Sequence, residues 1–306
     1  MTGHPLTFGV MTYEAEPWPE LTARWEWFER LGLDSLWAGD HVWSSIVEGR
    51  AVRPRFDAWL LLAGMAAATT RPTLGPLVSG MPFRGPAMVA KQAVTLDHMS
   101  AGRLVLGLGA GGNPADHAAC GVPLWGQDER VARFGEYVEI VRGMLSEDTF
   151  DYAGAYYQAT GTVRAPAPVQ PAVPLTIAAH VPGTLRVAAR HADTWSSYGT
   201  LFSQMRRGVT LSEEEAVRTT ARRAALLDEY AAEQGRDPSS IRRSFLAGFT
   251  ADRPFASVEA FRDFVGRYRE IGITEFVFLY PGPGGVDPVL FEKICAEVVP
   301  DLRAAG

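Results

Sequence analysis

Short apolar segments alternate with longer amphipathic segments along almost the whole chain. An apolar run at 6–11 is followed by WPELTARWEWFERLG, whose apolar residues recur at helical spacing and which stops at Gly32. The same pair recurs seven times. Strands are predicted at 6–11, 35–38, 73–78, 103–108, 175–179, 194–198, 243–249 and 275–280, and the later helices at 57–69, 86–99, 128–145, 183–191, 212–233, 258–271 and 288–302. Eight strands, each followed by a helix, predict a closed (β/α)8 TIM barrel, an α/β fold, as one domain over 1–306.

The rhythm is interrupted once, after the fourth helix. The stretch FDYAGAYYQAT alternates aromatic residues around a glycine turn, which predicts a hairpin. The proline-rich stretch RAPAPVQPAVP follows and predicts a surface excursion. We therefore expect a hairpin and loop insertion at about 150–174.

Composition excludes several classes of function. The net charge is -6 without a basic cluster, which argues against nucleic-acid binding. The two cysteines give no disulfide framework, and the chain shows no signal peptide and no apolar run that would span a bilayer. We expect a cytoplasmic protein with no membrane partner. His117 and Cys120 are too isolated to form a metal site, so no metal is predicted.

Polar and aromatic residues follow several predicted strand ends, where barrel enzymes build their active sites. Asp40 and His41 come just after the second strand; a solvated loop pair is the alternative interpretation. Histidine suits general acid or base chemistry because its ordinary pKa is near neutral pH. Four aromatic residues are predicted to wall an apolar pocket, and we expect at least one of them to be core material only: Trp43, Phe83, Trp195 and Tyr198.

A glycine-rich run, RLVLGLGAGGNP, has the GxGxxG spacing of a dinucleotide fingerprint. It follows the fourth strand rather than the first, and the next stretch, PADHAACGVPLWG, predicts a loop rather than a helix and second strand. We favour a backbone that closely approaches a flat or phosphorylated ligand. A plain glycine-rich turn is the alternative.

Three stretches together resemble the bacterial luciferase-like superfamily of flavin- and coenzyme F420-dependent oxidoreductases. They are the Asp40-His41 pair, LGPLVSGMPFRGPAMVAKQAVTLDHMSAGRLVLGLGAGG at 74–112, and PLTIAAHVPGTLRVAARHADTW at 174–195. The resemblance covers nearly the whole chain. It implies a TIM barrel, usually a homodimer, that binds reduced FMN or coenzyme F420 and acts on a small molecule, with a reductase as a further partner that supplies reduced cofactor.

The resemblance also implies roles for individual residues. His41 would act in catalysis, and Asp40 would orient the cofactor ring or tune the histidine. Leu77 and Val78 match a segment that forms a non-prolyl cis peptide behind the ring in deazaflavin-dependent relatives. The cofactor-binding residues implied are Asp40, Leu77, Val78, Ala110, Gly111, Gly112, Ala179, His180, Val181 and Thr184.

The resemblance favours hydride transfer with F420. The Asp-His pair is typical of the deazaflavin branch, and Ala110 stands where luciferase-type monooxygenases carry an arginine for the FMN phosphate. Gly112 stands where the sugar-phosphate dehydrogenases of that branch carry a catalytic glutamate, so their substrate is not implied. The alternatives are a reduced-FMN monooxygenase that uses oxygen, and a barrel that binds a flavin without turnover. A cofactor-free lyase or isomerase would need a lysine or paired carboxylates at the strand ends, and the sequence offers neither.

Overall fold

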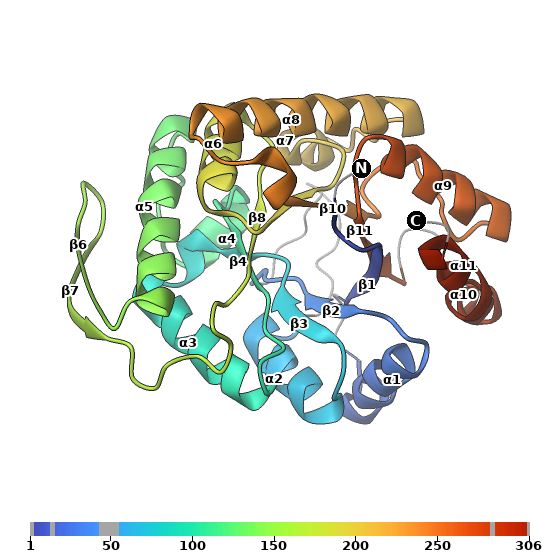
Figure 1. Ribbon diagram of the computed structural model, residues 1–306, viewed down its shortest axis with the longest axis horizontal. Helices are drawn as coiled ribbons and strands as arrows, with labels where there is room; N and C mark the ends of the chain where they lie inside the picture. Colours follow the sequence, from blue (N-terminus) through green and yellow to red (C-terminus); the bar gives the residue numbers. More distant parts are fainter. Residues whose placement is uncertain (1–2, 13–15, 43–54, 282–284, 305–306) are drawn as a thin grey trace.

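The computed structural model describes residues 3–12, 16–42, 55–281 and 285–304, and it shows a ring of parallel strands surrounded by helices (Figure 1). The strands are β1 (Thr7–Thr12), β2 (Ser35–Ala38), β3 (Thr73–Pro76), β4 (Ser79–Gly80), β5 (Leu106–Gly109), β8 (Leu175–Ala178), β9 (Thr194–Ser197), β10 (Arg242–Ala247) and β11 (Glu275–Tyr280). They pair in the order β3-β2-β1-β11-β10-β9-β8-β5-β4. A parallel bridge between Leu74 and Leu104 joins β3 to the residues before β5, so the sheet closes into the predicted barrel.

The third strand differs from its prediction as one run at 73–78. It divides into β3 and β4, and the peptide between them, Leu77–Val78, is cis, as the resemblance implies. β4 pairs with the end of β5 through Ser79 and Leu108. Together β3 and β4 therefore occupy one position of the eight-stranded barrel.

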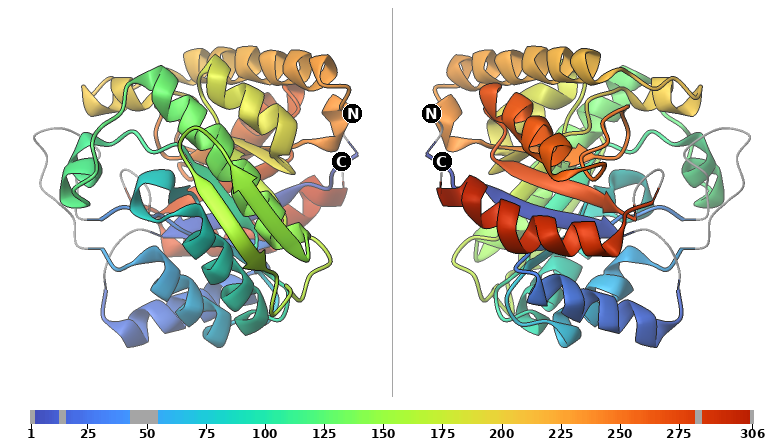
Figure 2. Two further views of the ribbon diagram at one scale, coloured as in Figure 1. Left: turned by 90° about the vertical axis from the view of Figure 1, so that its left-hand side faces the viewer. Right: turned by 90° about the vertical axis from the view of Figure 1, so that its right-hand side faces the viewer.

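The long helices form the outer ring, seen from its sides in Figure 2. They are α1 (Trp18–Arg30), α2 (Ala58–Ala68), α3 (Pro86–Met99), α5 (Gln127–Ser146), α6 (Pro182–His191), α8 (Glu213–Glu233), α9 (Val258–Glu270) and α10 (Pro288–Lys293), the last continued by a π-helical turn at Ile294–Val298 and by α11 (Val299–Ala304). Local sequence sets their starts, because Asp57, Ser212 and Ser257 each accept a hydrogen bond from a backbone N–H of the first turn. None of the helices in the described part of the chain is long and apolar enough to cross a bilayer.

The sequence prediction missed two short helices at the carboxyl end of the barrel. α4 (Pro114–Ala119) lies inside the stretch predicted as a loop, and α7 (Phe202–Arg206) follows β9. Each spans fewer than two helical turns, too short for an apolar period to become visible. The loop prediction for 114–119 is therefore wrong.

The predicted hairpin is confirmed. β6 (Thr149–Ala153) and β7 (Gln158–Val163) pair in antiparallel fashion and lie outside the barrel beside α5 (Figure 2). The carboxylate of Glu136 on α5 accepts hydrogen bonds from the backbone N–H groups of residues 155, 156 and 157 at the turn. Because the turn amides are satisfied by a helix side chain, the hairpin is fixed to α5.

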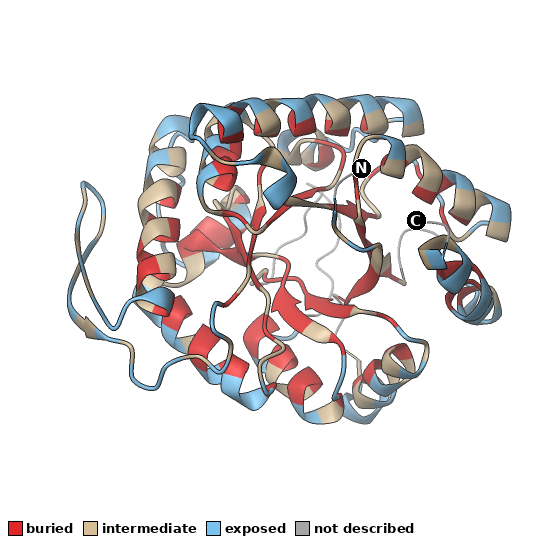
Figure 3. Cartoon of the chain, viewed as in Figure 1, coloured by how far each residue is buried: buried red, intermediate tan, exposed pale blue. Residues whose placement is uncertain are grey.

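The strands are buried on both faces, as expected where helices cover a parallel sheet (Figure 3). The larger core lies between the sheet and the helices. A smaller cluster inside the barrel consists of Met11, Trp37, Leu77, Leu246 and Val277. A Cβ atom on Gly75 would lie 2.9 Å from the Trp37 ring and 2.0 Å from the carbonyl oxygen of Val105, so the glycine makes room for this interior packing.

One arginine secures the opposite, amino-terminal end of the barrel. The Arg103 guanidinium donates hydrogen bonds to the carbonyl oxygens of Ala66 (3.0 Å), Thr69 (2.8 Å) and Pro72 (2.9 Å), where α2 ends and β3 begins. Its Nε donates to the carbonyl oxygen of Ser100 at 2.8 Å. These bonds satisfy helix-terminal carbonyls that would otherwise lack partners.

Candidate active site

A cavity of about 350 Å³ opens at the carboxyl ends of the strands, where active sites of TIM barrels lie. Its volume falls at the lower end of the roughly 300–1,000 Å³ typical of ligand sites. The apolar part of its wall consists mainly of Leu77, Val78, Phe83, Leu246 and Phe249. Polar side chains that follow β2, β5, β8 and β9 form the rest of the wall. The cavity is therefore an apolar pocket with a few polar groups that could form hydrogen bonds to a ligand.

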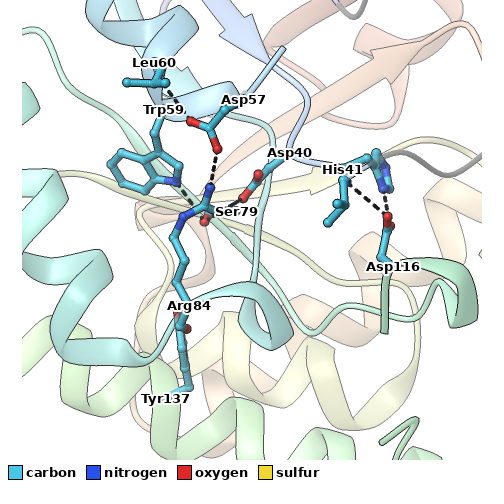
Figure 4. Close-up of polar contacts among 10 residues, drawn as sticks. Asp40, His41, Asp57, Trp59, Leu60, Ser79, Arg84, Asp116 and Tyr137 are labelled. Carbon is cyan, nitrogen blue, oxygen red and sulfur yellow. Dashed lines mark hydrogen bonds and ion pairs between the residues drawn. The ribbon is translucent and has the colours of Figure 1, made fainter. Parts of the chain in front are cut away.

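Asp40 is part of a buried polar network, shown in Figure 4. Its Oδ2 atom accepts hydrogen bonds from the Ser79 hydroxyl at 3.1 Å and from an Arg84 guanidinium nitrogen at 2.6 Å. The other terminal nitrogen of Arg84 donates to Asp57 at 2.7 Å. Burial raises the pKa of the Asp40 carboxyl, and the Arg84 guanidinium opposes that rise. Asp40 is therefore held in place by Arg84 and Ser79.

His41 pairs with a different carboxylate, as Figure 4 also shows. His41 Nδ1 lies 2.7 Å from Oδ2 of Asp116, which is only 1% exposed. Oδ1 of Asp116 accepts a hydrogen bond from the Val42 backbone N–H at 3.1 Å, and Asn113 Nδ2 donates to Oδ2 at 2.9 Å. A carboxylate accepts only, so in the neutral ring Nδ1 carries the hydrogen and Nε2 offers the lone pair. The structure thus adds Asp116 as a partner of His41, while the role of Asp40 in orienting the cofactor ring or tuning the histidine stays a prediction.

Sequence reasoning missed Asp116 because it predicted a loop at this place. The side chain of Asn113 accepts a hydrogen bond from the Ala115 backbone N–H at 3.2 Å, and Pro114 occupies the first helical position. The first turn of α4 then carries Asp116 toward His41. The signal was present: asparagine followed by proline and, two residues later, by an acid is typical of a helix start.

The glycine-rich run lets strand β5 pack closely against the β3–β4 link, and its last residues line the cavity. A Cβ atom on Gly107 would lie 2.0 Å from the carbonyl oxygen of Pro76, and one on Gly109 would lie 2.4 Å from a Val78 methyl, so both let β5 approach the β3–β4 link. Gly111 has a φ of +63°, and a Cβ there would lie 2.5 Å from Pro82. Gly112 has no atom within 4 Å of such a Cβ. Ala110, Gly111 and Gly112 all line the cavity, and Gly112 leaves the backbone most open to a ligand.

The residues after β8 and in the first turn of α6 contribute three of the four predicted positions to the cavity wall: His180, Val181 and Thr184. Ala179 is fully buried beneath them. The backbone N–H groups of His180 and Val181 donate to the Thr184 hydroxyl at 3.3 and 3.4 Å, so these two amides already have a partner within the chain. Burial, reinforced by Arg223, holds the pKa of the His180 imidazole well below its usual value, so its ring is neutral.

The four predicted pocket aromatics have different positions. Phe83 and Tyr198 line the cavity. Trp195 is a core residue with no exposed surface, and its ring N–H donates to the carbonyl oxygen of Ala179 at 2.9 Å. The prediction that it walls the pocket is therefore wrong, because its indole points into the packed interior. Trp43 lies outside the described residues.

The residues present fit a flat heteroaromatic cofactor. The apolar wall suits a ring system, and the open backbone at Gly112 allows a ring to approach closely. Two imidazole nitrogens at the cavity could also form hydrogen bonds to a ligand. These are the Nε2 atoms of His117 and His180, which are buried without a hydrogen-bond partner among the described residues although both side chains line the cavity. In the described ranges, no group of three or more His, Cys, Asp or Glu side chains is arranged to hold a metal ion.

Comparison with known proteins places these observations in context. A family model described as luciferase-like monooxygenase matches residues 3–273. An F420-dependent glucose-6-phosphate dehydrogenase of Kineococcus radiotolerans is 36% identical over 168 residues, which cover 54% of this chain and 48% of that protein. The chain thus spans about half the length of the curated relatives it matches.

Two solved structures share the fold. An F420-dependent secondary alcohol dehydrogenase in complex with an F420-acetone adduct superposes with a TM-score of 0.77 at 19% identity, covering 97% of this chain and 99% of that one. A long-chain alkane monooxygenase superposes with a TM-score of 0.77 at 15% identity, covering 99% of this chain and 92% of that one. At these identities the likeness establishes the barrel fold.

Proposed function

The chain belongs to the luciferase-like monooxygenase family of flavin- and F420-dependent oxidoreductases, and on that premise we propose that it transfers a hydride between a small organic substrate and coenzyme F420 bound at the mouth of the barrel. One observation carries the proposal: the Asp116–His41 pair beside an apolar cavity that has the open backbone of Gly112 in its wall. Moving a hydride to or from a carbon that bears oxygen requires a group that takes or supplies the accompanying proton.

The proposed roles follow from the contacts. When bound, the deazaflavin ring supplies the carbon that accepts or donates the hydride. His41 exchanges the proton of the substrate oxygen at Nε2, because Asp116 fixes the hydrogen of the neutral ring on Nδ1. Asp40, buried and held by Arg84, places a fixed carboxyl at the edge of the cavity. The apolar side chains around them exclude water from the reacting atoms.

Two further observations support F420 over FMN. The relative from Kineococcus, 36% identical over 168 residues, is named as an F420-dependent dehydrogenase. Ala110 lines the cavity at the position where the sequence resemblance places a phosphate-binding arginine in FMN monooxygenases. The second candidate function is a reduced-FMN monooxygenase that uses oxygen, and the apolar wall of the cavity favours it.

The deciding experiment is a binding titration of the purified protein with F420 and with FMN, each in its oxidised and reduced form. Tight binding of F420 with weak binding of FMN supports the proposal. Selective binding of reduced FMN would overturn it in favour of the monooxygenase. A His41→Ala variant is the matched control: it should bind the cofactor with the wild-type dissociation constant yet reduce turnover by about a hundredfold or more.

We also propose that the protein is a homodimer in the cytoplasm that depends on a separate reductase for reduced cofactor. Support for the dimer comes from apolar side chains near the starts of α1 and α2: Trp18, Phe56 and Leu60 are 47%, 42% and 70% exposed. The Trp18 and Phe56 rings lie 6.3 Å apart. Light scattering should give twice the chain mass of 33.3 kDa, and Leu60→Glu should reduce it to one chain.

A further inference from the structure

His117 on α4 places a buried hydrogen-bond acceptor at the cavity. Its side chain is only 1% exposed and belongs to the cavity wall. Nδ1 lies 2.9 Å from the carbonyl oxygen of Pro123, which only accepts, so in the neutral ring the hydrogen is on Nδ1 and Nε2 carries the lone pair. The Trp125 ring lies nearly perpendicular to the imidazole, with 5.5 Å between the ring centroids. The orientation of the acceptor is therefore fixed by the α4 segment itself.

The lone pair on Nε2 of His117 has no hydrogen-bond donor among the described residues. Most buried polar atoms in folded proteins are paired, and leaving one unpaired costs free energy. An unpaired acceptor in a cavity wall is therefore a ready partner for a donor on a ligand. Nε2 lies beside the bend at Gly111, because a Cβ atom on that glycine would lie 3.9 Å from it. The missing donor thus belongs at the end of the glycine-rich run.

The same bend offers hydrogen-bond donors beside this acceptor. The backbone N–H groups of Gly111 and Gly112 donate no hydrogen bond within the part of the chain that the structure describes, and both residues line the cavity. An acceptor accompanied by N–H donors matches a cyclic imide, in which an N–H group lies between two carbonyl groups. A carboxylate or phosphate would place oxygen lone pairs against the lone pair of Nε2. This part of the wall therefore suits a neutral imide better than an anion.

We propose that His117 Nε2 accepts a hydrogen bond from the imide N–H of the cofactor's pyrimidine ring and so selects the orientation in which the ring enters the cavity. The inference rests on the proposed function, since it requires a flavin or deazaflavin ring at this place. Both ring systems carry the imide, so the contact serves either cofactor. His117 exchanges no proton in this role, and the pair of His41 with Asp116 is separate from it.

The test compares FMN with its N3-methyl derivative, in which a methyl group replaces the imide hydrogen; if the protein binds F420 alone, F420 and its N3-methyl derivative take their place. Titrations at pH 8, where histidine is ordinarily neutral, give the ratio of the two dissociation constants. In the wild type, methylation should weaken binding by about 10- to 100-fold, because Nε2 loses its donor. In His117→Leu the two ligands should bind almost equally. His117→Gln, whose amide oxygen accepts, should restore part of the difference.

Folding of the variants does not limit this test. Pro123 is exposed, so water can replace Nδ1 at its carbonyl oxygen, and a ratio of two dissociation constants does not depend on the folded fraction of the sample.

His180→Leu is the matched control, because His180 lines the same cavity and its Nε2 also has no partner among the residues that the structure describes. It should leave the ratio at the wild-type value. A wild-type ratio in His117→Leu, or an equal loss of the ratio in His180→Leu, would overturn the assignment. A wild type that binds the methylated and unmethylated rings equally would overturn it too. If the wild type binds neither ring system, the proposed function itself fails, which is a different result.

Discussion

Replacing Asp116 with asparagine tests whether this carboxylate fixes the reactive form of His41. Among the contacts within the described residues, Asp116 accepts hydrogen bonds from His41 Nδ1 and Asn113 Nδ2 at Oδ2, and from the Val42 N–H at Oδ1. An amide of the same shape has one oxygen and one NH2 group. In either orientation it must turn its NH2 group toward at least one of these donors, and it carries no charge.

The magnitude follows from the strength of the lost contact. A hydrogen bond to a charged group contributes about 1.5–3 kcal/mol, roughly twice a neutral one. Losing all or half of that free energy changes the equilibrium between the two neutral forms of the ring by about 3- to 150-fold. We therefore expect Asp116→Asn to reduce turnover by about 10- to 100-fold while the dissociation constant of the cofactor stays near the wild-type value.

The position of the hydrogen can be measured without any substrate. Long-range 1H–15N NMR spectra distinguish the two ring nitrogens, and His41→Ala identifies the His41 signals among the six histidines of the chain. The neutral wild-type ring should carry its hydrogen on Nδ1, and the Asp116→Asn ring should show a larger share on Nε2. Asp128→Asn, at an exposed position in the first turn of α5, is the control. Unchanged spectra and full turnover in Asp116→Asn would refute the role given to Asp116.

Three further substitutions separate binding from stability. Gly112→Val should weaken cofactor binding without lowering the melting temperature, because a Cβ atom there has no protein atom within 4 Å. Gly111→Val should lower the melting temperature, because Gly111 has a φ of +63° and a Cβ atom there would lie 2.5 Å from Pro82. Equal melting temperatures for the two variants would contradict this. Arg84→Met leaves the Asp40 charge buried and should cost about 3–5 kcal/mol at neutral pH. A carboxyl with a raised pKa binds its proton more tightly in the folded state, so the loss of unfolding free energy in Arg84→Met should shrink as the pH falls through the pKa of Asp40 in the variant. Adding Asp40→Asn to Arg84→Met should remove this pH dependence, as measured by denaturant titrations. Arg103→Met should lower the free energy of unfolding by at least about 3 kcal/mol yet leave cofactor affinity unchanged, and a changed affinity would contradict its assignment to the structural end of the barrel.

The fold could be predicted from the sequence because its signal is periodic and repeated. Helix α3 and strands β2 and β11 have the predicted bounds, since apolar periodicity and breaker residues both mark their ends. The division of the third strand and the two short helices could not be derived from periodicity. Each depends on a few residues whose conformation is decided by packing at the mouth of the barrel, as at Val78, which lies against Gly109.

The candidate site was only partly predictable for the same reason. The order of elements places His41 and the glycine-rich run at one end of the barrel, so their proximity follows from topology alone. The partner of His41 does not, because 75 residues separate it from Asp116 and the contact requires the unpredicted helix α4. Trp195 lies within β9 and Phe83 follows β4, but only the packed structure shows that the indole enters the core while the phenyl ring faces the cavity.

Arg84 has a consequence for anyone who redesigns this enzyme. Its guanidinium joins Asp40 after β2 to Asp57 at the start of α2, while its own backbone belongs to the segment between β4 and α3. Loop exchange usually treats each βα loop of a barrel as an independent cassette. Here these segments share one cation, so a graft that replaces the segment carrying Arg84 must also bring compatible residues at positions 40 and 57. In libraries that vary one of these segments alone, fewer variants will fold.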